Sequence, residues 1–258
     1  MMTRTFKPTS PTRQTLTAIV SSLLLLATVQ AALGDADTGS IKQKIAERLP
    51  GVTVDHIVPS PVKGIYEVGI DGSDVVYISA DGRYFFSGPL VDMITRENLT
   101  ERVRAEQRVK ILKEVPEKSM IIFEPNAEVK HTLTIFTDID CPFCRKLHRE
   151  MPLLNRMGIR VRYMFFPRAG IGSDSYEKAV SVWCADNQQA EMTLAKSGKV
   201  PELRDCDNPV RQQMALARRL GLRGTPYLIT ETGRTISGYV PAPELFESLE
   251  ADKDKPVQ

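Results

Sequence analysis

The sequence has few cysteines, and this limits how they can be used. Only four occur in 258 residues, and residues 35–95 contain none. Cys141 and Cys144 form a C-x-x-C motif, whereas Cys184 and Cys206 lie 22 positions apart and form no second one. A C-x-x-C motif can be half of a zinc site or the reactive pair of a redox protein. Without a second motif, zinc is the weaker interpretation.

Residues 1–31 lack acidic residues altogether. Arg4, Lys7 and Arg13 precede an apolar stretch at 16–28, and small or permissive residues follow at 29–31. This order is typical of a secretory signal peptide, and the apolar stretch is short for a membrane span. No later segment is long enough to cross a bilayer. We therefore expect export and removal of residues 1–31; an uncleaved membrane anchor is the alternative.

Without that segment the chain has almost no net charge. The full sequence has 34 Lys and Arg against 32 Asp and Glu, and removing three basic residues leaves 31 against 32. This balance gives no electrostatic reason to bind nucleic acid or an anionic membrane surface. In an oxidising compartment, four cysteines favour disulfides over zinc thiolates.

Residues 35–95 predict a small β-rich module after one short helix. Apolar, partly alternating runs occur at 52–54, 65–70, 75–78 and 84–86, and Asp-Gly pairs mark tight turns. This pattern indicates an antiparallel meander. A unit of about 60 residues buries little surface by itself. We expect it to form a homodimer; packing against the rest of its own chain is the alternative.

The sequence of residues 98–114 predicts a mostly polar helix that Asn98 can cap, within a linker at 96–116. A polar helix of this kind favours a solvated spacer between domains, and a helix packed on the following sheet is the alternative. From residue 117 strands and helices alternate, which indicates an α/β domain. Strands are expected near 120–123, 132–136, 160–166, 227–229 and 236–240. One helix is expected over 175–197, and Pro152 should kink the helix that follows Cys144.

The C-x-x-C motif lies between a β-branched apolar run at 132–136 and a helical pattern. Cys141 should therefore begin a helix, where free backbone N–H groups and the helix dipole stabilise a solvent-facing thiolate. Cys144 lies one turn later and can resolve a mixed disulfide, and Pro142 is tolerated in this first turn. His148 could pair with Cys144 on a metal, although the exposed side of the helix is its more usual place.

Two further features near the motif have open roles. Asp138 and Asp140 could tune the pKa of Cys141 or could be exposed strand-end acids, and we assign them no role. Thr225 and Pro226 open a later strand. A proline there can follow a cis bond, and the backbone around Thr225 could then pair with an extended substrate. An ordinary trans proline in a loop is the alternative.

The strand, Cys-Pro-Phe-Cys, helix and distant Gly-Thr-Pro resemble the thioredoxin superfamily. The residues Phe136-Thr137-Asp138-Ile139-Asp140-Cys141, Phe166-Pro167-Arg168, Trp183-Cys184 and Gly238-Tyr239, together with the leader, the β-rich module and the polar helix, are similar to the DsbC-type periplasmic disulfide isomerases of bacteria. The resemblance implies an α+β and α/β architecture. The resemblance also implies that residues 1–31 are a signal peptide and that residues 35–95 form a cystatin-like dimerisation domain. We then expect a helical linker at 96–116, followed by a thioredoxin-like domain with a helical insertion at 117–258.

The resemblance also implies function and partners. Cys141 and Cys144 would isomerise incorrect disulfides of exported proteins in the periplasm, without a metal or cofactor. Thr225 and cis-Pro226 would contact the substrate, and Cys184 and Cys206 would form a structural disulfide. The protein would be a V-shaped homodimer with its active sites facing an apolar cleft. A membrane thiol reductant similar to DsbD would keep it reduced.

One departure concerns the residues between the active cysteines. The family usually has Gly-Tyr there, whereas this chain has Pro142-Phe143, and a proline in the first position is more like the oxidase DsbA. These residues influence thiolate stability and redox poise. The alternatives to an isomerase are therefore a disulfide-donating oxidase and a mainly non-catalytic holding chaperone.

Overall fold

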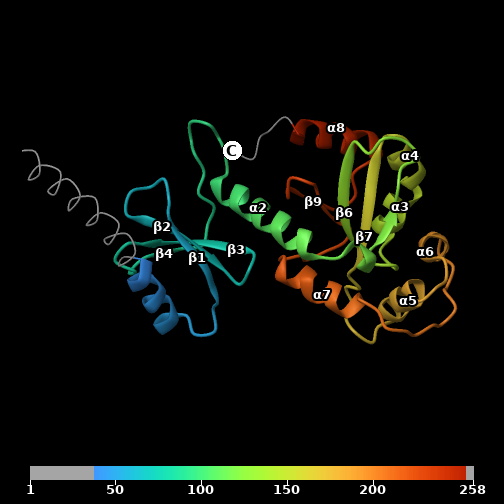
Figure 1. Cartoon of the computed structure of the whole chain (residues 1–258), viewed down its shortest axis with the longest axis horizontal. Helices are drawn as coiled ribbons and strands as arrows, with labels where there is room; N and C mark the ends of the chain where they lie inside the picture. The colour runs from blue at the N-terminus through green and yellow to red at the C-terminus, as the bar shows by residue number, and fades with distance from the viewer. Residues whose placement is uncertain (1–37, 254–258) are drawn as a thin grey trace, which may run out of the picture. The chain divides into compact units, whose positions relative to one another are not determined.

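The computed structural model describes residues 38–253, so the expected signal peptide at 1–31 lies outside the described residues. Contacts divide the chain into two compact units (Figure 1). One contains the described residues up to Val68 together with Tyr77–Phe86, and the other contains Gly69–Val76 together with the residues from Ser87 onward. None of the helices in this described region combines the length and apolar character that a membrane span needs.

The N-terminal part has a helix at residues 38–48 followed by a four-stranded sheet. Ile41 and Ile45 are buried, as their spacing of four predicts. The strands lie in chain order, and they are β1 (Val54–Pro59), β2 (Ile65–Ile70), β3 (Asp74–Ser79) and β4 (Phe85–Phe86). β3 and β4 pair antiparallel. The predicted β-rich module is confirmed, with its first strand beginning at Val54 rather than at residue 52.

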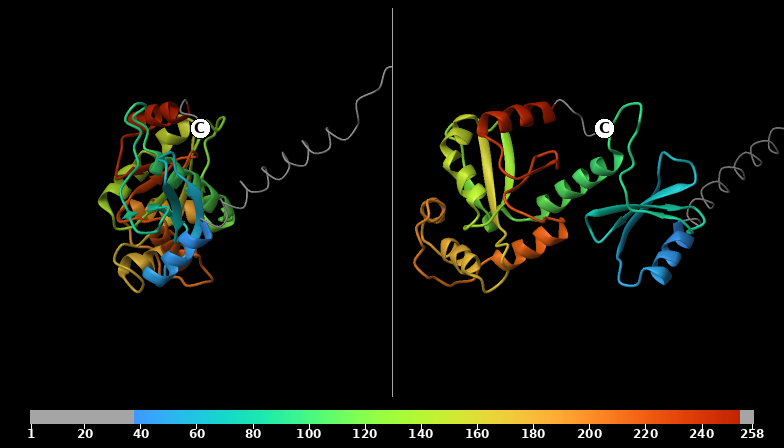
Figure 2. Two further views of the ribbon diagram at one scale, coloured as in Figure 1. Left: turned by 90° about the vertical axis from the view of Figure 1, so that its left-hand side faces the viewer. Right: turned by 180° about the vertical axis from the view of Figure 1, so that it is seen from behind.

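The second unit is built on a five-stranded mixed sheet with the order β5-β7-β6-β8-β9 (Figures 1 and 2). β6 and β7 are parallel, and the other neighbouring strands are antiparallel. β6 is mostly buried and includes the buried polar residues His131, Thr134 and Thr137, whereas in β7 the half-buried Arg160 and Arg162 alternate with buried apolar residues. The strands are β5 (Ile121–Phe123), β6 (His131–Thr137), β7 (Ile159–Phe165), β8 (Tyr227–Ile229) and β9 (Thr235–Ser237).

Helices surround this sheet. α4 packs against β7 and α8, α7 packs against β7, and α6 packs against α3 and α5. The helices are α2 (Leu99–Glu114), the short 3-10 helix η1 (Glu117–Ser119), α3 (Pro142–Arg149), α4 (Met151–Arg156), α5 (Asp174–Trp183), α6 (Gln188–Lys196), α7 (Val210–Arg219) and α8 (Ala242–Lys253).

Two predicted helices are interrupted in the structure. The helix after Cys141 breaks at Glu150, and Pro152 lies in the first turn of α4, where its missing N–H needs no partner. This break confirms the expected effect of Pro152. The single helix expected over 175–197 is wrong, because α5 ends at Trp183 and α6 begins at Gln188. The Asn187 side chain accepts the Ala190 N–H at 3.0 Å and starts the new helix.

The polar helix α2 is not solvated along its whole length. Ile111 and Leu112 in its last turns join the core of the second unit. Arg108 is 8% exposed and donates to the Gly233 carbonyl at 3.0 Å, while Glu101 accepts a second bond from it at 2.7 Å. Any Cβ on Gly233 would lie 2.1 Å from the Ala105 carbonyl oxygen. The C-terminal half of α2 therefore belongs to the packed α/β unit, although the helix is polar in composition.

Candidate active site

Cys141 and Cys144 lie where β6 ends and α3 begins. β6 ends at Thr137, Cys141 is the N-cap residue of α3, and Pro142 occupies the first turn. Cys144 follows within that turn, and both cysteines are free thiols. The local sequence accounts for this placement. The apolar residues at 132–136 favour a buried strand, and Pro142 has a fixed backbone angle that suits the first turn of a helix.

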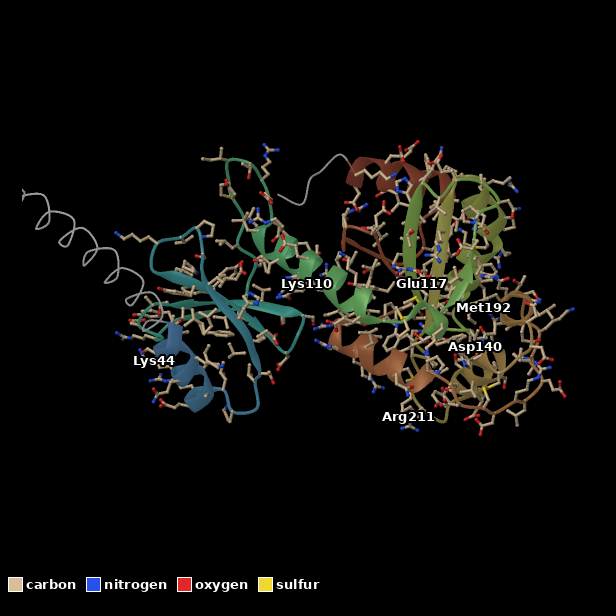
Figure 3. All side chains as sticks on the ribbon, in the orientation of Figure 1. Lys44, Lys110, Glu117, Asp140, Met192 and Arg211 are labelled. Atoms are coloured by element: carbon tan, nitrogen blue, oxygen red, sulfur yellow. A yellow bond between two sulfur atoms is a disulfide. The ribbon has the colours of Figure 1, made fainter. Side chains whose placement is uncertain are left out.

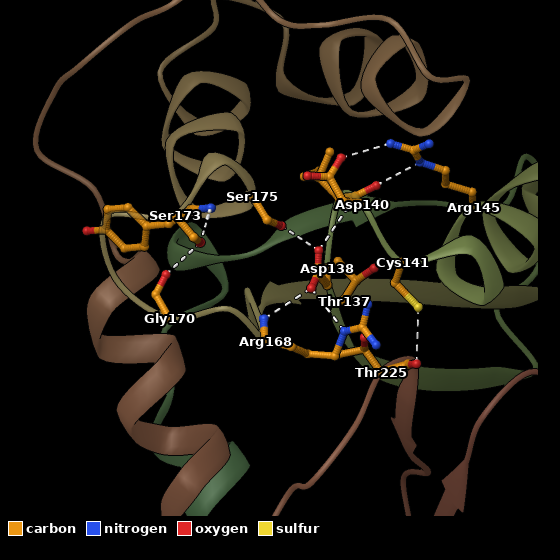
Figure 4. Close-up of polar contacts among 12 residues, drawn as sticks. Thr137, Asp138, Asp140, Cys141, Arg145, Arg168, Gly170, Ser173, Ser175 and Thr225 are labelled. Carbon is orange, nitrogen blue, oxygen red and sulfur yellow. Dashed lines mark hydrogen bonds and ion pairs between the residues drawn. The ribbon is translucent and has the colours of Figure 1, made fainter.

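Cys141 does not face solvent, which corrects the expectation from the sequence. It is 1% exposed, as is Cys144. The Cys141 thiol donates to the carbonyl oxygen of Thr225 at 3.2 Å, across 84 residues of chain (Figure 4). The loop that carries Thr225 thus lies directly against the sulfur. Burial of this kind depends on a distant segment and therefore has no local sequence signal.

The structure brings Thr225 and Pro226 beside the C-x-x-C motif. The peptide bond between them is cis, as the family resemblance implies, and β8 starts at the next residue. Within the described part of the chain, the buried Thr225 hydroxyl oxygen lacks a hydrogen-bond partner. A cavity of about 530 Å³ borders this loop and is lined by residues that include Gly224, Thr225, Pro226 and Gly238. The loop therefore offers polar backbone and hydroxyl groups next to the reactive sulfur.

The environment of Cys141 favours its ionised form. The pKa of Cys141 is lowered from 9.0 to about 5, and the largest cause is a hydrogen bond from the Cys144 thiol. Burial opposes this shift, while the Cys144 backbone N–H and the positive charge of Arg168 support it. At neutral pH Cys141 is therefore a thiolate, the form that attacks disulfides.

The environment of Cys144 favours its protonated form. Burial, followed by its hydrogen bond to Cys141, raises the pKa of Cys144 far above its ordinary value. Cys144 therefore remains a protonated thiol that donates to its neighbour. The pair is thus divided into one sulfur ready to attack and one that holds its proton.

Asp138 organises the polar residues on one side of this pair, a role that the sequence analysis did not assign. Its carboxylate is 3% exposed and accepts hydrogen bonds from the Ser175 hydroxyl and from Arg168 N and Nε at 3.0 and 3.1 Å (Figure 4). The backbone N–H of Asp140 donates to it as well, at 2.9 Å. Burial would raise the pKa of Asp138, but these bonds outweigh it and hold the pKa below its usual value. Asp138 thereby fixes Arg168, whose charge favours the Cys141 thiolate.

Asp140, which is labelled in Figure 3, forms ion pairs with side chains of two helices. Its carboxylate accepts from Arg145 of α3 at 2.9 Å and from Lys178 of α5 at 3.0 Å. The Asp140 side chain is 33% exposed, so these ion pairs are partly screened by water. Asp140 is therefore a tether for the loop, whereas Asp138 is a buried organising group.

The other two cysteines form a disulfide. Cys184 caps the C-terminus of α5, and Cys206 lies in the exposed loop before α7. Their bond encloses α6 in a loop with a sequence separation of 22. The two cysteines are therefore in a different chemical state from the free pair on α3.

His148 lies in the protein interior, contrary to the expected exposed face of its helix. It is 5% exposed, with Nδ1 at 3.3 Å from the Tyr163 hydroxyl and Nε2 at 3.1 Å from the Thr193 hydroxyl. Burial, aided by the charge of Lys196, lowers the pKa of His148 to about 3, so the ring is neutral. Residues 38–253 hold no group of three or more His, Cys, Asp or Glu side chains arranged to bind a metal ion.

The ionisation of Cys141 can be measured by alkylation. We expect its reaction rate with iodoacetamide to be half-maximal near pH 5 and constant at higher pH, because its pKa lies at about 5. Mass spectrometry of the modified peptide follows the reaction across a pH series. In Cys144→Ala the midpoint should move upward, because the main hydrogen bond is lost. A midpoint near 9 in both proteins would contradict the assignment.

Asp138→Ala should lower the free energy of unfolding by about 3 kcal/mol at pH 7, because it leaves several buried donors unpaired. The folded-state pKa of Asp138 is depressed. Its stabilisation is therefore complete above its ordinary pKa and declines as the pH falls through the folded value. Urea unfolding at pH 7 and pH 3 should show a smaller difference at pH 3. Asp140→Ala is the matched control and should cost about 1 kcal/mol or less; an equal loss in both variants contradicts the prediction.

The chain matches two protein families and several curated proteins over most of its length. Residues 30–101 match the disulfide bond isomerase protein N-terminal domain, and residues 117–252 match the thioredoxin-like domain. Thiol:disulfide interchange protein DsbC of Escherichia coli (strain K12) is 34% identical over 88% of this chain and 94% of that protein. DsbC of Salmonella typhimurium is 36% identical over 83% of this chain and 88% of its own length.

A crystal structure of a disulfide interchange protein from Neisseria gonorrhoeae is 32% identical, with a TM-score of 0.49, and covers 54% of this chain and 99% of that one. The thioredoxin-like architecture expected for the C-terminal unit is confirmed by the family match and by the mixed sheet with its surrounding helices. Because the sequence similarity to the curated relatives spans both units, the chain belongs to the DsbC family of thiol:disulfide interchange proteins.

Proposed function

We propose that this protein is a thiol–disulfide interchange enzyme that isomerises incorrect disulfides in exported proteins. The observation that carries the proposal is the unequal pair of sulfurs at the start of α3. Cys141 has a pKa of about 5, while Cys144 keeps its proton. One thiolate can attack at neutral pH, and the second thiol is in reserve to end a stalled reaction.

The reaction begins when the Cys141 thiolate attacks one sulfur of a substrate disulfide. A bond forms between Cys141 and that sulfur, and the other substrate sulfur leaves as a thiolate. A different substrate thiolate then attacks the substrate sulfur of this mixed disulfide. The new substrate disulfide forms, and Cys141 leaves as the thiolate again. Rearrangement by this route consumes no electrons.

A stalled mixed disulfide is resolved by Cys144. Its sulfur attacks Cys141, the bond between Cys141 and the substrate breaks, and the substrate leaves as a thiol. The substrate disulfide has then gained two electrons, and the Cys141–Cys144 pair has lost them. A membrane thiol reductant similar to DsbD would restore the reduced pair. No metal or other cofactor takes part in these steps.

Thr225 and Pro226 are proposed to position the substrate. The Thr225 carbonyl oxygen lies 3.2 Å from the Cys141 sulfur, and the adjoining cavity is lined by both Thr225 and Pro226. An extended substrate segment could pair with the backbone here, as extended peptides do with exposed strand edges. Main-chain recognition tolerates many side chains, which suits an enzyme that meets varied misfolded proteins.

The disulfide between Cys184 and Cys206 is proposed to be structural. Cys206 lies in an exposed loop, and each sulfur of this pair already has its partner. In the chain-entropy model, closing a loop of this size stabilises a domain by roughly 3 kcal/mol. The disulfide would therefore hold α6 and its flanking loops against the rest of the unit.

We infer periplasmic residence and the following organisation. Residues 1–31 would be the signal peptide, 35–95 the dimerisation domain, 96–116 the linker and 117–258 the catalytic domain. The support is the basic, then apolar order of residues 1–31, together with the family matches at 30–101 and 117–252. Misfolded exported proteins with disulfides would be the substrates.

An oxidase is the second candidate, and Pro142-Phe143 is the observation that favours it. A stabilised thiolate makes the reduced pair more stable and the disulfide a stronger oxidant. The low pKa of Cys141 acts in the same direction. An isomerase works from the reduced form, whereas an oxidase donates its disulfide, so the two activities can be separated by the redox state supplied.

Refolding of a scrambled multi-disulfide protein tests the proposal. We expect the reduced enzyme to restore native pairing and Cys141→Ala to abolish this activity, because the attacking sulfur is gone. Cys144→Ala should retain attack but accumulate mixed disulfides that non-reducing electrophoresis detects. Activity from the oxidised form alone would instead identify an oxidase. Suppressed aggregation without any Cys141-dependent rearrangement would identify a holding chaperone.

Dimerisation through the N-terminal domain can be tested by mass. β4 is a short edge strand whose Phe85 and Phe86 are each 49% exposed. Light scattering of the processed protein should give twice the chain mass, and Phe85→Lys with Phe86→Lys should shift it toward the monomer, because charges on an apolar edge oppose association. Lys substitution at the exposed Val129 is the control. A monomer in the unsubstituted protein would contradict the prediction.

A further inference from the structure

Lys196 is a buried cation that the proposed reaction has not used. It is the last residue of α6 and is 2% exposed. Its Nζ donates to the Thr137 hydroxyl and to the Asp138 carbonyl, each at 2.7 Å. Lysine is seldom buried to this degree, because removing an ammonium from water is costly. Both acceptors lie just before the C-x-x-C motif, so the charge is held next to the active-site loop.

The groups that face Lys196 come from several elements. Burial lowers its pKa to about 8, while Cys144 when it is ionised and the charges of Asp138 and Cys141 raise it, and Arg145 lowers it further. At pH 7 most of Lys196 is therefore the ammonium form. The neighbouring His148 is neutral, and burial keeps Tyr163 protonated by raising its pKa. Neither ring therefore opposes the action of Lys196 on the cysteines.

The influence of Lys196 on Cys144 depends on the state of Cys141. Burial and the hydrogen bond to Cys141 raise the pKa of Cys144, whereas Lys196 is the first of the groups that lower it, and the Thr137 hydroxyl also contributes. In a mixed disulfide Cys141 carries no negative charge and no longer accepts the Cys144 proton. The hydrogen bond to Cys141, one of the two main causes that keep Cys144 protonated, is then lost, whereas the Lys196 ammonium that favours the Cys144 thiolate is still present.

We propose that the buried Lys196 ammonium drives the resolution step, by ionising Cys144 once Cys141 is bound in a mixed disulfide. This inference rests on the proposed function. Lys196 acts through Cys144 and the Thr137 hydroxyl, so it is a positioning residue. The Cys144 thiolate attacks the Cys141 sulfur, the bond from Cys141 to the substrate sulfur breaks, and the proton lost by Cys144 ends on the departing sulfur. Before substrate binds, the same ammonium leaves Cys144 protonated.

Oxidised glutathione separates the two steps. Reduced protein is mixed with it, samples are quenched with acid, and mass spectrometry follows first the glutathione adduct on Cys141 and then its loss. Lys196→Met retains most of the length of the unbranched side chain and removes its charge. We expect resolution of the adduct to slow by about tenfold or more, because an opposite charge at close range shifts a pKa by about one to three units. Formation of the adduct should change by less than about threefold, since the main support of the Cys141 thiolate is intact.

Two further variants separate the effect of the Lys196 charge from that of its hydrogen bonds and from that of losing any lysine. Lys196→Gln can still donate a hydrogen bond to Thr137 or Asp138 but has no charge, so it should resolve as slowly as Lys196→Met. Lys199→Met removes an exposed lysine three residues later and should behave like the unsubstituted protein. Normal resolution in Lys196→Gln would overturn the proposal, because a hydrogen bond alone would then suffice. If no adduct forms on Cys141 in the unsubstituted protein, the proposed function itself fails.

A measurement on the unsubstituted protein does not depend on how the variants fold. Carbon-13 NMR of the Lys196 side chain gives its titration in the reduced and the oxidised protein. We expect a lower titration midpoint in the oxidised protein, because the negative charge of Cys141, which raises the pKa of Lys196, is absent from a disulfide. Equal midpoints in the two redox states would show that Lys196 does not sense the pair and would overturn the inference.

Discussion

The hydrogen bond between the Cys144 thiol and the Cys141 thiolate is the interaction on which the chemistry of this protein depends. It lowers one pKa and raises the other, so two identical side chains become a nucleophile and a reserve thiol. The fold supplies the geometry, because the first turn of α3 places both sulfurs on the same side of the helix. Burial of both residues then strengthens their coupling, since water screens the interaction less in a low-dielectric site.

Buried polar groups around the pair keep this arrangement rigid. Asp138 fixes Arg168 on one side, and Lys196 holds the Thr137 hydroxyl and the Asp138 carbonyl on another. Each has hydrogen-bond partners that offset part of its desolvation cost. Polar groups fixed in this way need little rearrangement when charge moves between the sulfurs, which is the general advantage of a preorganised site.

The sequence predicts those parts of the site that are local. The apolar run before Cys141 and the helical pattern after it suffice to place the C-x-x-C motif at a strand–helix junction. The position of Thr225 against Cys141 depends on chain closure over 84 residues, and only the family resemblance suggested it. Burial of Asp138, His148 and Lys196 could not be predicted, because the pattern cannot show that α6 packs on α3. A lysine flanked by Ser197 and near Thr193 has the sequence context of a surface residue.

The low pKa of Cys141 also bears on the balance between rearrangement and release. A thiol of low pKa is a good leaving group, so Cys141 departs readily when a substrate thiolate attacks the mixed disulfide. Isomerisation requires that departure, whereas closure of the Cys141–Cys144 disulfide requires Cys144 to ionise instead. A buried ammonium that assists Cys144 therefore shortens the time available for rearrangement. On this proposal, the balance between isomerisation and closure of the disulfide depends on Lys196 as well as on Pro142 and Phe143, the two residues between the cysteines.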